Sequence, residues 1–404
     1  AADNKHVGCS ALEEIILERR QTRRSGLLAR VNNIVDNMRC ADLMKASESN
    51  PNYPSKVREM TNYTIREIKK VCKDIGPRPS GEENERKAQD YVADSMSKVA
   101  DSVVKEKFEL HPKAFMGWVP LDVILMTISV ILTLLSYFDV LPSASTAFSV
   151  VSVVLTSLAI IFTFFEFLLY KKFLDPFFPK RETYNVVCTR KAAGETKRRI
   201  VFSGHIDSAY EWYFTHLGGG KLLTTMIALA FGAIAITLAA SIVSFFDVPN
   251  GVRVTAIVVL FVCLIPILMC SLFVNWKLCV PGANDNLTGV FASMSVLRYM
   301  AANDIRFENT EVVCVSMACE EAGLRGAKEY VKKHCGEDDV ETVFVGTDTL
   351  RDFDDMGVYN KDMTGTVKLD KQAAAMVKHA SDIAGYNLPY SSVFFGSSDA
   401  AAIQ

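Results

Sequence analysis

Four long apolar runs lie along the chain and form two pairs. Residues 123–138 and 140–165 make the first pair, and residues 222–246 and 254–276 make the second. A helix needs roughly 20 apolar residues to cross a bilayer, and each run is near or above that length. Helices of this length inside a globular core rarely lack charge altogether. The pattern therefore predicts four transmembrane helices rather than buried core helices.

The connectors within the pairs, DVLPSAS and DVPNGVR, are short, so each pair is expected to form a helical hairpin. Residues 1–115, 172–221 and 277–404 must then lie on one side of the membrane. Basic residues beside the membrane gather on that side, at Lys113, Lys171, Lys172, Lys180, Arg181, Lys221 and Lys277. The far loops carry only Arg253. The positive-inside rule therefore places the polar parts of an integral membrane protein in the cytoplasm.

A transport pathway would place acids, bases or paired helix breaks at mid-membrane. The four runs lack such groups, although Pro266 and Asn275 fall within the fourth run. We therefore expect the hairpins to anchor the protein in the lipid bilayer rather than to carry a solute across it.

Outside the hairpins, segments with helical spacing alternate with segments that have the pattern of strands. The predicted helices are 83–99, 286–301, 323–334 and 371–385, and the predicted strands are 184–190, 198–205, 310–318, 342–348 and 392–400. The strand at 310–318 is continuously apolar and should be buried on both faces. The alternation predicts an α/β fold with a mainly parallel sheet and helices on both faces, interrupted by two transmembrane helical hairpins.

Composition narrows the possible functions. The net charge of −2 gives no global field that would recruit nucleic acid, so no such partner is expected. Ten cysteines are scattered over 404 residues without a CxxC pair. A secreted disulfide scaffold would be shorter and denser in cysteine. We therefore expect free thiols in a reducing compartment or in lipid, which agrees with the cytoplasmic orientation.

Possible metal ligands follow the predicted strands at one edge of the sheet. They are His205, Asp207, Asp285, Glu320, Glu321 and Asp348. Taken singly, each has a simpler interpretation, such as a helix cap for Asp285 or a helix-dipole contact for Glu320 and Glu321. Taken together, the carboxylates would repel strongly unless cations neutralised them. Imidazole with carboxylates suits zinc, with cobalt or manganese as possible substitutes.

Several motifs resemble the clan of co-catalytic di-zinc exopeptidases (clan MH). They are SGHIDS, GANDN followed by TGV, EEAGLRGA, the strand-end Asp348, and IGPRPSGEENERKAQDYV. That clan includes the bacterial leucyl aminopeptidases, vacuolar aminopeptidase Y and glutamate carboxypeptidase II. The likeness covers residues 70–115, 183–215 and 279–404, and both hairpins interrupt it.

The resemblance implies a ligand set for two zinc ions. His205 would bind one zinc, Asp285 would bridge both, and Glu321 and Asp348 would bind the second. The clan pattern includes one further histidine ligand, after the last strands of the sheet.

The resemblance also implies roles for two acids that bind no metal. Asp207 would hydrogen-bond His205 and fix its tautomer. Glu320 would be the general base that takes a proton from the bridging water and passes it to the leaving amine. Glu320 and Asp207 are therefore the expected catalytic pair.

No histidine in this sequence matches the further ligand of the clan, because none follows His379. Either the protein continues beyond Gln404 and supplies it there, or the protein is a degenerate member with one metal or none. We favour the first alternative. His216 and His379 are the remaining candidates for this ligand. The simpler interpretation of His216 is a residue in a membrane-proximal loop, and that of His379 is a residue in a packed helix.

The resemblance divides the chain into six parts. They are a basic helical segment (1–69), peptidase parts (70–115, 172–221 and 277–404, the last incomplete) and hairpins (116–171 and 222–276). The basic stretch 17–39 is a solvated helix or a contact for anionic lipid. The motif HLGGGK lacks the phosphate-loop pattern and fits a hinge before a membrane helix.

Three other functions compete with a zinc aminopeptidase acting on peptides. A non-catalytic scaffold, as the transferrin receptor is within the clan, would have lost metal ligands, whereas most expected positions survive here. A glutaminyl cyclase-like enzyme uses a single zinc, and the dinuclear set disfavours it. A transporter rests only on the hairpins. The sequence does not separate aminopeptidase from carboxypeptidase and does not indicate an oligomeric state.

Overall fold

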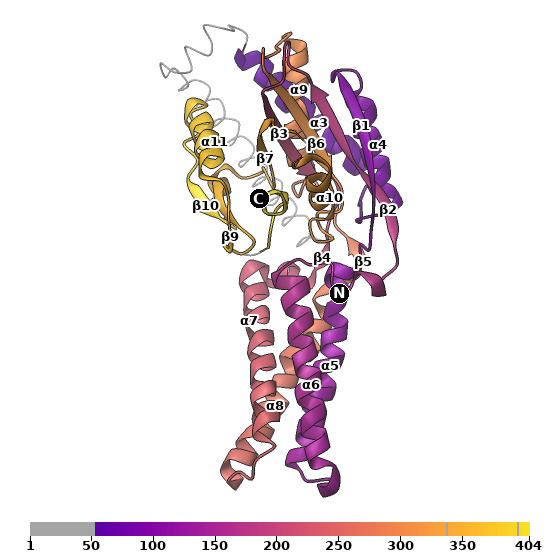
Figure 1. Cartoon of the computed structure of the whole chain (residues 1–404), viewed down its shortest axis with the longest axis vertical. Helices are drawn as coiled ribbons and strands as arrows, with labels where there is room; N and C mark the ends of the chain where they lie inside the picture. The colour runs from indigo at the N-terminus through magenta and orange to yellow at the C-terminus, as the bar shows by residue number, and fades with distance from the viewer. Residues whose placement is uncertain (1–52, 337, 394–395) are drawn as a thin grey trace, which may run out of the picture.

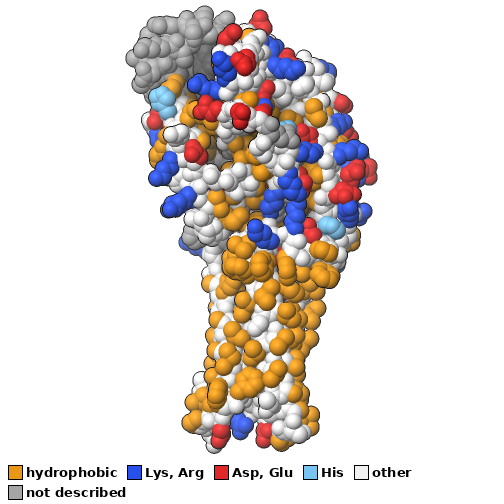
Figure 2. Space-filling model, in the orientation of Figure 1, with side chains coloured by type: hydrophobic (Ala, Val, Ile, Leu, Met, Phe, Trp, Pro, Cys, Tyr) orange, Lys and Arg blue, Asp and Glu red, His pale blue; other side chains and the backbone are white. Residues whose placement is uncertain are grey.

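The computed structural model describes residues 53–336, 338–393 and 396–404, and the basic stretch 17–39 lies outside these residues. A polar α/β head stands on a stalk of four long helices (Figure 1). The head carries most of the charged side chains, and the stalk surface is apolar along most of its length, with a few charges at its far end (Figure 2).

A five-stranded mixed sheet forms the centre of the head, in the order β1-β2-β6-β3-β7. The strands are β1 (Ser102–Leu110), β2 (Arg181–Arg190), β6 (Thr310–Met317), β3 (Arg198–His205) and β7 (Glu341–Gly346). Strand β3 pairs parallel with β6 and β7, whereas β2 pairs antiparallel with β1 and β6. The prediction of a mainly parallel sheet therefore holds for β6, β3 and β7, whose ends carry the predicted site residues, and does not hold for β1 and β2.

Strand β1 was not predicted. Its sequence SVVKEKFEL carries four charges, three of them consecutive, and it lies at the sheet edge with only β2 beside it. An edge strand that is half exposed has little apolar signal. The central strand β6 lies between β2 and β3 and is buried over most of its length, as its apolar sequence predicts.

Helices cover both faces of the sheet, as expected. On one face, α3 (Tyr53–Asp74), α4 (Glu83–Met96) and α9 (Leu287–Ala302) bury their apolar sides in the main core. On the other face, α10 (Arg325–His334) and α12 (Asp399–Ile403) lie over the sheet. Helix α3 crosses the expected boundary at residue 69.

A small second sheet lies beside the main one, with β10 (Tyr390–Ser392), β8 (Val358–Asp362) and β9 (Val367–Lys368), next to α11 (Lys371–Ile383). The prediction of a last main-sheet strand at 392–400 is wrong. Strand β10 ends where that segment begins and joins the small sheet instead. Ser398 then caps α12 by accepting a hydrogen bond from the Ala400 N–H, which favours a helix there.

The stalk contains α5 (Ala114–Tyr137), α6 (Ser145–Phe162) with the π-helical turn η2 (Thr163–Leu168), α7 (Tyr213–Val243) and α8 (Asn250–Met269). With the turns that adjoin them, these four segments are long and apolar enough to cross a membrane. Helix α7 is interrupted at Gly218 and Gly219, where HLGGGK predicts a hinge, and Gly219 has φ 64°.

The fourth apolar run does not stay helical to residue 276. Its end belongs to β5 (Val274–Cys279), which pairs antiparallel with β4 (Tyr210–Trp212). This two-stranded ribbon lies where the stalk meets the head (Figure 1). It joins the start of α7 to the segment that follows α8.

Candidate metal centre

The carboxyl ends of the three parallel strands meet at one edge of the sheet. In the β3–β6 register His205 lies opposite Met317, and in the β3–β7 register Ser203 lies opposite Gly346. The loops after these strands therefore start from adjacent points, which is where α/β sheets place their chemistry. Helix α9 adds its N-terminal loop to the same edge.

The structure brings five of the predicted residues into one cluster around His205. The Nε2 atom of His205 lies 3.1 Å from Asp285 Oδ1, 3.6 Å from Asp348 Oδ2 and 3.7 Å from Glu320 Oε2. Two groups have ligand atoms within 4.8 Å of one another: His205 with Glu320 and Glu321, and His205 with Asp285 and Asp348. Asp348 thus groups with His205, whereas the resemblance pairs it with Glu321.

Asp207 holds the other side of the imidazole ring. Its Oδ1 lies 3.3 Å from His205 Nδ1. The same carboxylate accepts hydrogen bonds from the backbone N–H groups of Glu320 and Glu321, at 3.1 and 3.0 Å, and from Ser80 Oγ at 2.7 Å. A proton on Nδ1 facing Asp207 leaves the lone pair of Nε2 directed at the acidic cluster.

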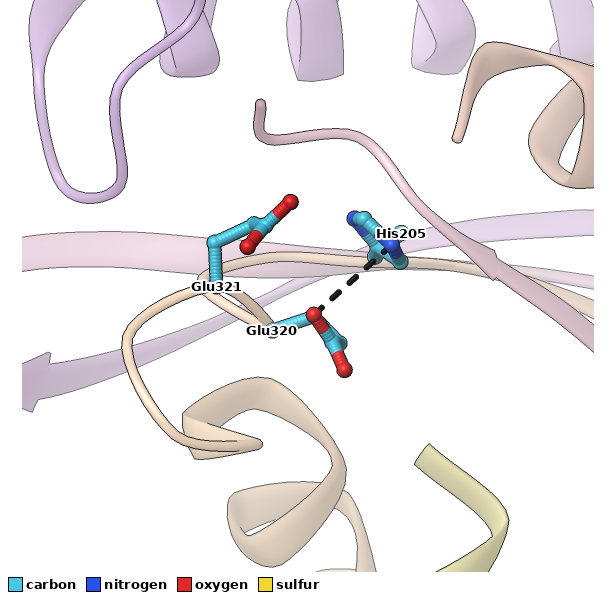
Figure 3. A group of neighbouring side chains, drawn as sticks. All are labelled: His205, Glu320 and Glu321. Carbon is cyan, nitrogen blue, oxygen red and sulfur yellow. Dashed lines mark ion pairs between the residues drawn. The ribbon is translucent and has the colours of Figure 1, made fainter. Parts of the chain in front are cut away.

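Glu320 and Glu321 lie in a loop and not in the first turn of a helix, because α10 begins at Arg325. A helix-dipole contact therefore does not explain them. Their side chains leave the loop in different directions, and Glu320 points at His205 (Figure 3). Glu320 is nine-tenths buried, and Glu321 is half-buried.

Asp285 is not the cap of its helix. The side chain of the next residue, Asn286, caps α9 by accepting a hydrogen bond from the Gly289 N–H at 2.9 Å. A Cβ on Gly204 of β3 would lie 2.4 Å from the Gly289 carbonyl carbon, so only glycine allows this approach. The close packing of α9 on β3 brings Asp285 to His205.

The electrostatics of the cluster are unbalanced. Burial alone would lower the pKa of His205, but Glu320 and the other surrounding carboxylates raise it well above its ordinary value. Burial, reinforced by neighbouring carboxylates, raises the pKa of Glu320 and Glu321 well above the usual range for glutamate. Among the described residues, no lysine or arginine forms an ion pair with Asp285, Glu320, Glu321 or Asp348. A bound cation would supply the missing positive charge.

Sequence reasoning did not assign roles to three groups that support the cluster. The buried guanidinium of Arg78 donates to the carbonyls of Ile206 and Gly282, at 2.6 and 3.0 Å, and so joins the loops that carry His205 and Asp285. Ser80 bonds Asp207, as described above. Both lie in the quoted GPRPSG motif, whose polar residues were the available signal. Asp399 is buried nearby, and burial raises its pKa to about 7.

A large cleft opens over the cluster. Its charged lining consists of two histidines, His205 and His216, and seven acids, namely Glu211, Asp285, Glu320, Glu321, Asp348, Asp355 and Asp370. Within the described part of the chain, neither lysine nor arginine lines it. The cleft also touches Trp212 and Leu223, at the start of the third span.

The structure does not add His216 or His379 to the metal cluster. The Nδ1 atom of His216 lies 3.6 Å from Glu211 Oε1, at the stalk side of the cleft. His379 is exposed on α11. Neither belongs to a metal-type group among the described residues.

Comparison with known families gives one match by sequence. A model of peptidase family M28 matches residues 271–404. This part, one third of the chain, is therefore similar to that family. The matched part contains Asp285, Glu320, Glu321 and Asp348, whereas His205 lies before it. A search of curated proteins found no significant match.

Several solved structures are distantly similar in fold. An aminopeptidase of Legionella pneumophila is 11% identical with a TM-score of 0.43, covering 86% of this chain and 59% of its own. A zinc aminopeptidase of Bacillus subtilis is 13% identical with a TM-score of 0.44, covering 84% and 81%. A glutaminyl cyclase of Porphyromonas gingivalis is 9% identical with a TM-score of 0.45, covering 85% and 78%. These scores are too low to carry an argument about function.

Proposed function

We propose that this protein is a membrane-anchored, zinc-dependent aminopeptidase that removes N-terminal residues from peptides. The observation that carries the proposal is the cluster of four carboxylates around one imidazole, without a basic side chain to neutralise them. The match of residues 271–404 to peptidase family M28 supports the reaction class. The motif SGHIDS, which contains His205 and Asp207 at the end of β3, resembles the di-zinc exopeptidases, so we assign β3 to the same catalytic site.

The donor set fits zinc. One imidazole nitrogen and several carboxylate oxygens are ligands that zinc uses in catalytic sites. His205, Asp285 and Asp348 would hold one ion, and Glu321, with Asp285 shared, would hold the second. Their ligand atoms converge at one edge of the sheet, and a hydrogen bond from the backbone N–H of Glu321 to Asp207 holds the loop that carries Glu321. Zinc bound there would act as a Lewis acid and lower the pKa of a water molecule.

The protein's own groups would then move the proton. Glu320 accepts the proton of the attacking water and delivers it to the departing amine. Asp207 keeps the His205 ring in one orientation and, through two backbone N–H groups, fixes the loop that carries the base.

The charge of the cleft favours an aminopeptidase over a carboxypeptidase. A carboxypeptidase needs a cation to bind the C-terminal carboxylate of its substrate. The described lining holds no lysine or arginine, and three of its acids, Glu211, Asp355 and Asp370, lie outside the metal cluster, so it would attract the ammonium group of a peptide N-terminus instead. The positive-inside pattern supports the proposal that this head faces the cytoplasm.

Activity of the full chain in membranes tests the proposal. The wild type should hydrolyse aminoacyl-coumarin substrates and be inactive on N-acetylated analogues. Glu320→Gln should bind zinc normally and lose roughly 10²–10⁴-fold in turnover, the usual contribution of a general base. Glu329→Gln, on α10 outside the cleft, is the matched control. If the protein instead cyclised N-terminal glutamine and did not hydrolyse peptides, its function would be that of a glutaminyl cyclase and the aminopeptidase proposal would be wrong.

A further inference from the structure

A group of lysines lies where α10 meets the segment that follows the second stalk helix. These four lysines, which form the junction patch, are Lys171 and Lys172, just after η2, and Lys328 and Lys332 of α10. All are exposed except Lys328, which is half-buried. Lysine and arginine side chains are visible at the base of the head, directly above the apolar stalk (Figure 2).

Ion pairs hold α10 against this segment, although the two are far apart along the chain. Arg325 of α10 donates to Asp175, 150 residues earlier in the chain, at 2.7 Å, and both side chains are buried. Lys172 Nζ lies 2.6 Å from Glu329 Oε1 of α10. The positive-inside pattern accounts for the lysines beside η2 only. The fold adds the lysines of α10, which no sequence rule places at the membrane.

The junction patch has more cations than carboxylates. Glu329 Oε1 lies 2.6 Å from Lys172 Nζ and 2.7 Å from Lys332 Nζ, so two lysines share one acid. Within the described part of the chain, neither Lys171 nor Lys328 forms an ion pair. The patch therefore carries uncompensated positive charge and would attract an anion.

Lys328 occupies the centre of these contacts. Its Nζ donates to the carbonyls of Tyr170 and Gly323, so it ties the end of the second stalk helix to the loop that carries the metal-cluster glutamates. An ammonium group has three N–H donors, and these two carbonyls use two of them. An anion beside Lys328 would favour its charged form and accept from the third donor.

The patch lies at the level of phospholipid head groups if the stalk crosses a membrane as proposed. The second apolar span ends at Leu168, three residues before Lys171. The following segment exposes Phe173 and Phe177, at 44% and 79%. Apolar side chains exposed beside lysines are typical of segments at the boundary between head groups and acyl chains. A ligand of the patch therefore has an apolar surface beside it for a hydrocarbon chain.

We propose that the junction patch binds the head groups of anionic phospholipids in the membrane that the stalk crosses. The phosphate lies between the lysines of α10 and those beside η2, and the acyl chains lie along the apolar surface of the stalk. A phospholipid fits better than a soluble phosphate ester, because the patch continues directly into that surface. This inference rests on the membrane anchoring in the proposed function and is independent of the peptidase activity.

Native mass spectrometry of the full chain, released from detergent micelles, tests the patch. The probes are phosphatidylglycerol and phosphatidylcholine with identical acyl chains, because both contain a phosphate and only the first has a net negative charge. Phosphatidylglycerol should bind at least tenfold more tightly, and the preference should fall as the ionic strength rises. Equal affinity for the two lipids would overturn the proposal.

Two further measurements separate the possible reasons for failure. Glycerol 3-phosphate lacks acyl chains and should not displace phosphatidylglycerol at millimolar concentration; displacement would assign the patch to a soluble phosphate ester and overturn the lipid assignment. Extraction of the chain from membranes by alkaline carbonate would contradict the anchoring and this inference with it. Loss of the lipid preference in a chain that stays in the membrane would contradict the inference alone.

Two double variants with the same loss of charge locate the binding. Lys171→Gln with Lys332→Gln should weaken phosphatidylglycerol binding about 25-fold, fivefold for each lysine, and leave phosphatidylcholine binding unchanged. The control is Lys98→Gln with Lys197→Gln, which removes two exposed lysines before the starts of β1 and β3, at the end of the sheet away from the stalk. It should keep the wild-type affinity. Equal losses in the two double variants would show that binding follows net charge alone and would overturn the proposal.

Discussion

At the scale of single residues, the site depends on how a few side chains are held. Asp207 makes three hydrogen bonds with protein donors and also contacts the His205 ring, so it fixes both a ligand and the loop of the proposed base. It would orient the ligand without touching the metal. Partners of this kind usually contribute 10–100-fold to metal affinity.

We predict that Asp207→Ala weakens zinc binding about 10–100-fold, because the His205 ring loses its orienting partner. Competition with a chromogenic chelator measures the affinity. The exposed Asp94→Ala on α4 should leave the affinity unchanged. An unaltered affinity in Asp207→Ala would contradict the assigned orienting role.

Lys328 gives a pH-dependent prediction away from the metal cluster. Burial lowers its pKa to about 7, and Arg325 and Lys172 add to the effect, while its Nζ donates to the carbonyls of Tyr170 and Gly323. Between about pH 7 and the ordinary lysine pKa, the unfolded chain binds more protons than the folded chain. The free energy of unfolding therefore rises with pH across that window.

Lys328→Met should remove this dependence. Relative to the wild type, the variant should gain on the order of 1 kcal/mol near pH 7, about 2–4 °C in Tm, and lose that advantage towards pH 10. Thermal unfolding at a series of pH values measures the difference. A difference that stays constant with pH would show that Lys328 keeps its charge in the folded protein.

At the scale of elements, the contact between β3 and α9 sets the geometry of the site. A Cβ on Gly204 would collide with the backbone of Gly289 and Val290 at 2.4 Å. Gly204→Ala should therefore cost about 1–3 kcal/mol and move Asp285 away from His205, which lowers zinc affinity. Gly346→Ala on β7 is the control, because its Cβ would meet Phe344 at an ordinary 3.7 Å. Equal zinc affinity and stability for the two variants would exclude this constraint.

The hydroxyl network of the stalk gives a second prediction at this scale. Ser152 Oγ lies 2.6 Å from Ser129 Oγ, 2.6 Å from Thr133 Oγ1 and 2.7 Å from Ser241 Oγ, so it joins α5, α6 and α7. Ser152→Ala should destabilise the stalk by about 0.6–1.7 kcal/mol, the range measured for hydrogen bonds between membrane helices. Ser157→Ala, on another side of α6, should cost less in the same detergent unfolding assay.

Elements with a strong periodic or apolar pattern could be predicted from the sequence. Features that depend on contacts with distant segments could not. Strand β6 and the four stalk helices were predictable from their own residues. The position of β6 between β2 and β3 was not, since a seven-residue turn joins β2 and β3 along the chain and pairing is set by distant segments. The helix start at Arg325 lies two residues after the predicted start at residue 323.

The candidate site followed from the rule that ligands gather at strand ends, which brings His205, Glu320 and Asp348 together. The grouping of Asp348 with His205 was not predictable, because it depends on the order of β3 and β7 in the sheet. The GPRPSG motif marked Arg78, but the partners of its guanidinium were out of reach, because they are backbone carbonyls, which leave no sequence pattern.

At the scale of the whole molecule, an acidic cleft stands directly on a four-helix stalk. Residues from β4 and the start of α7 line the cleft, which lies at the end of the head that adjoins the stalk (Figure 1). If the stalk crosses a membrane as proposed, the active site would lie near its surface, and the head and the far loops would face opposite sides of the bilayer. This arrangement is the basis of a topology prediction.

Labelling with a membrane-impermeant maleimide in intact cells tests that topology. Cys335 is exposed on the head and should react only after the cells are permeabilised. Ser143→Cys, in the exposed far loop between α5 and α6, should react in intact cells. Labelling of Cys335 in intact cells would place the head outside the cytoplasm.

The most direct test of the central claim is the zinc content of the folded full-length chain after equilibration with zinc and removal of the excess. We predict two zinc ions per chain by mass spectrometry of the metal, and loss of both in Asp285→Ala, whose carboxylate is shared. A single ion would contradict the shared role of Asp285. A chain that keeps its circular dichroism and binds no zinc, cobalt or manganese would contradict the claim that cations neutralise this acidic cluster.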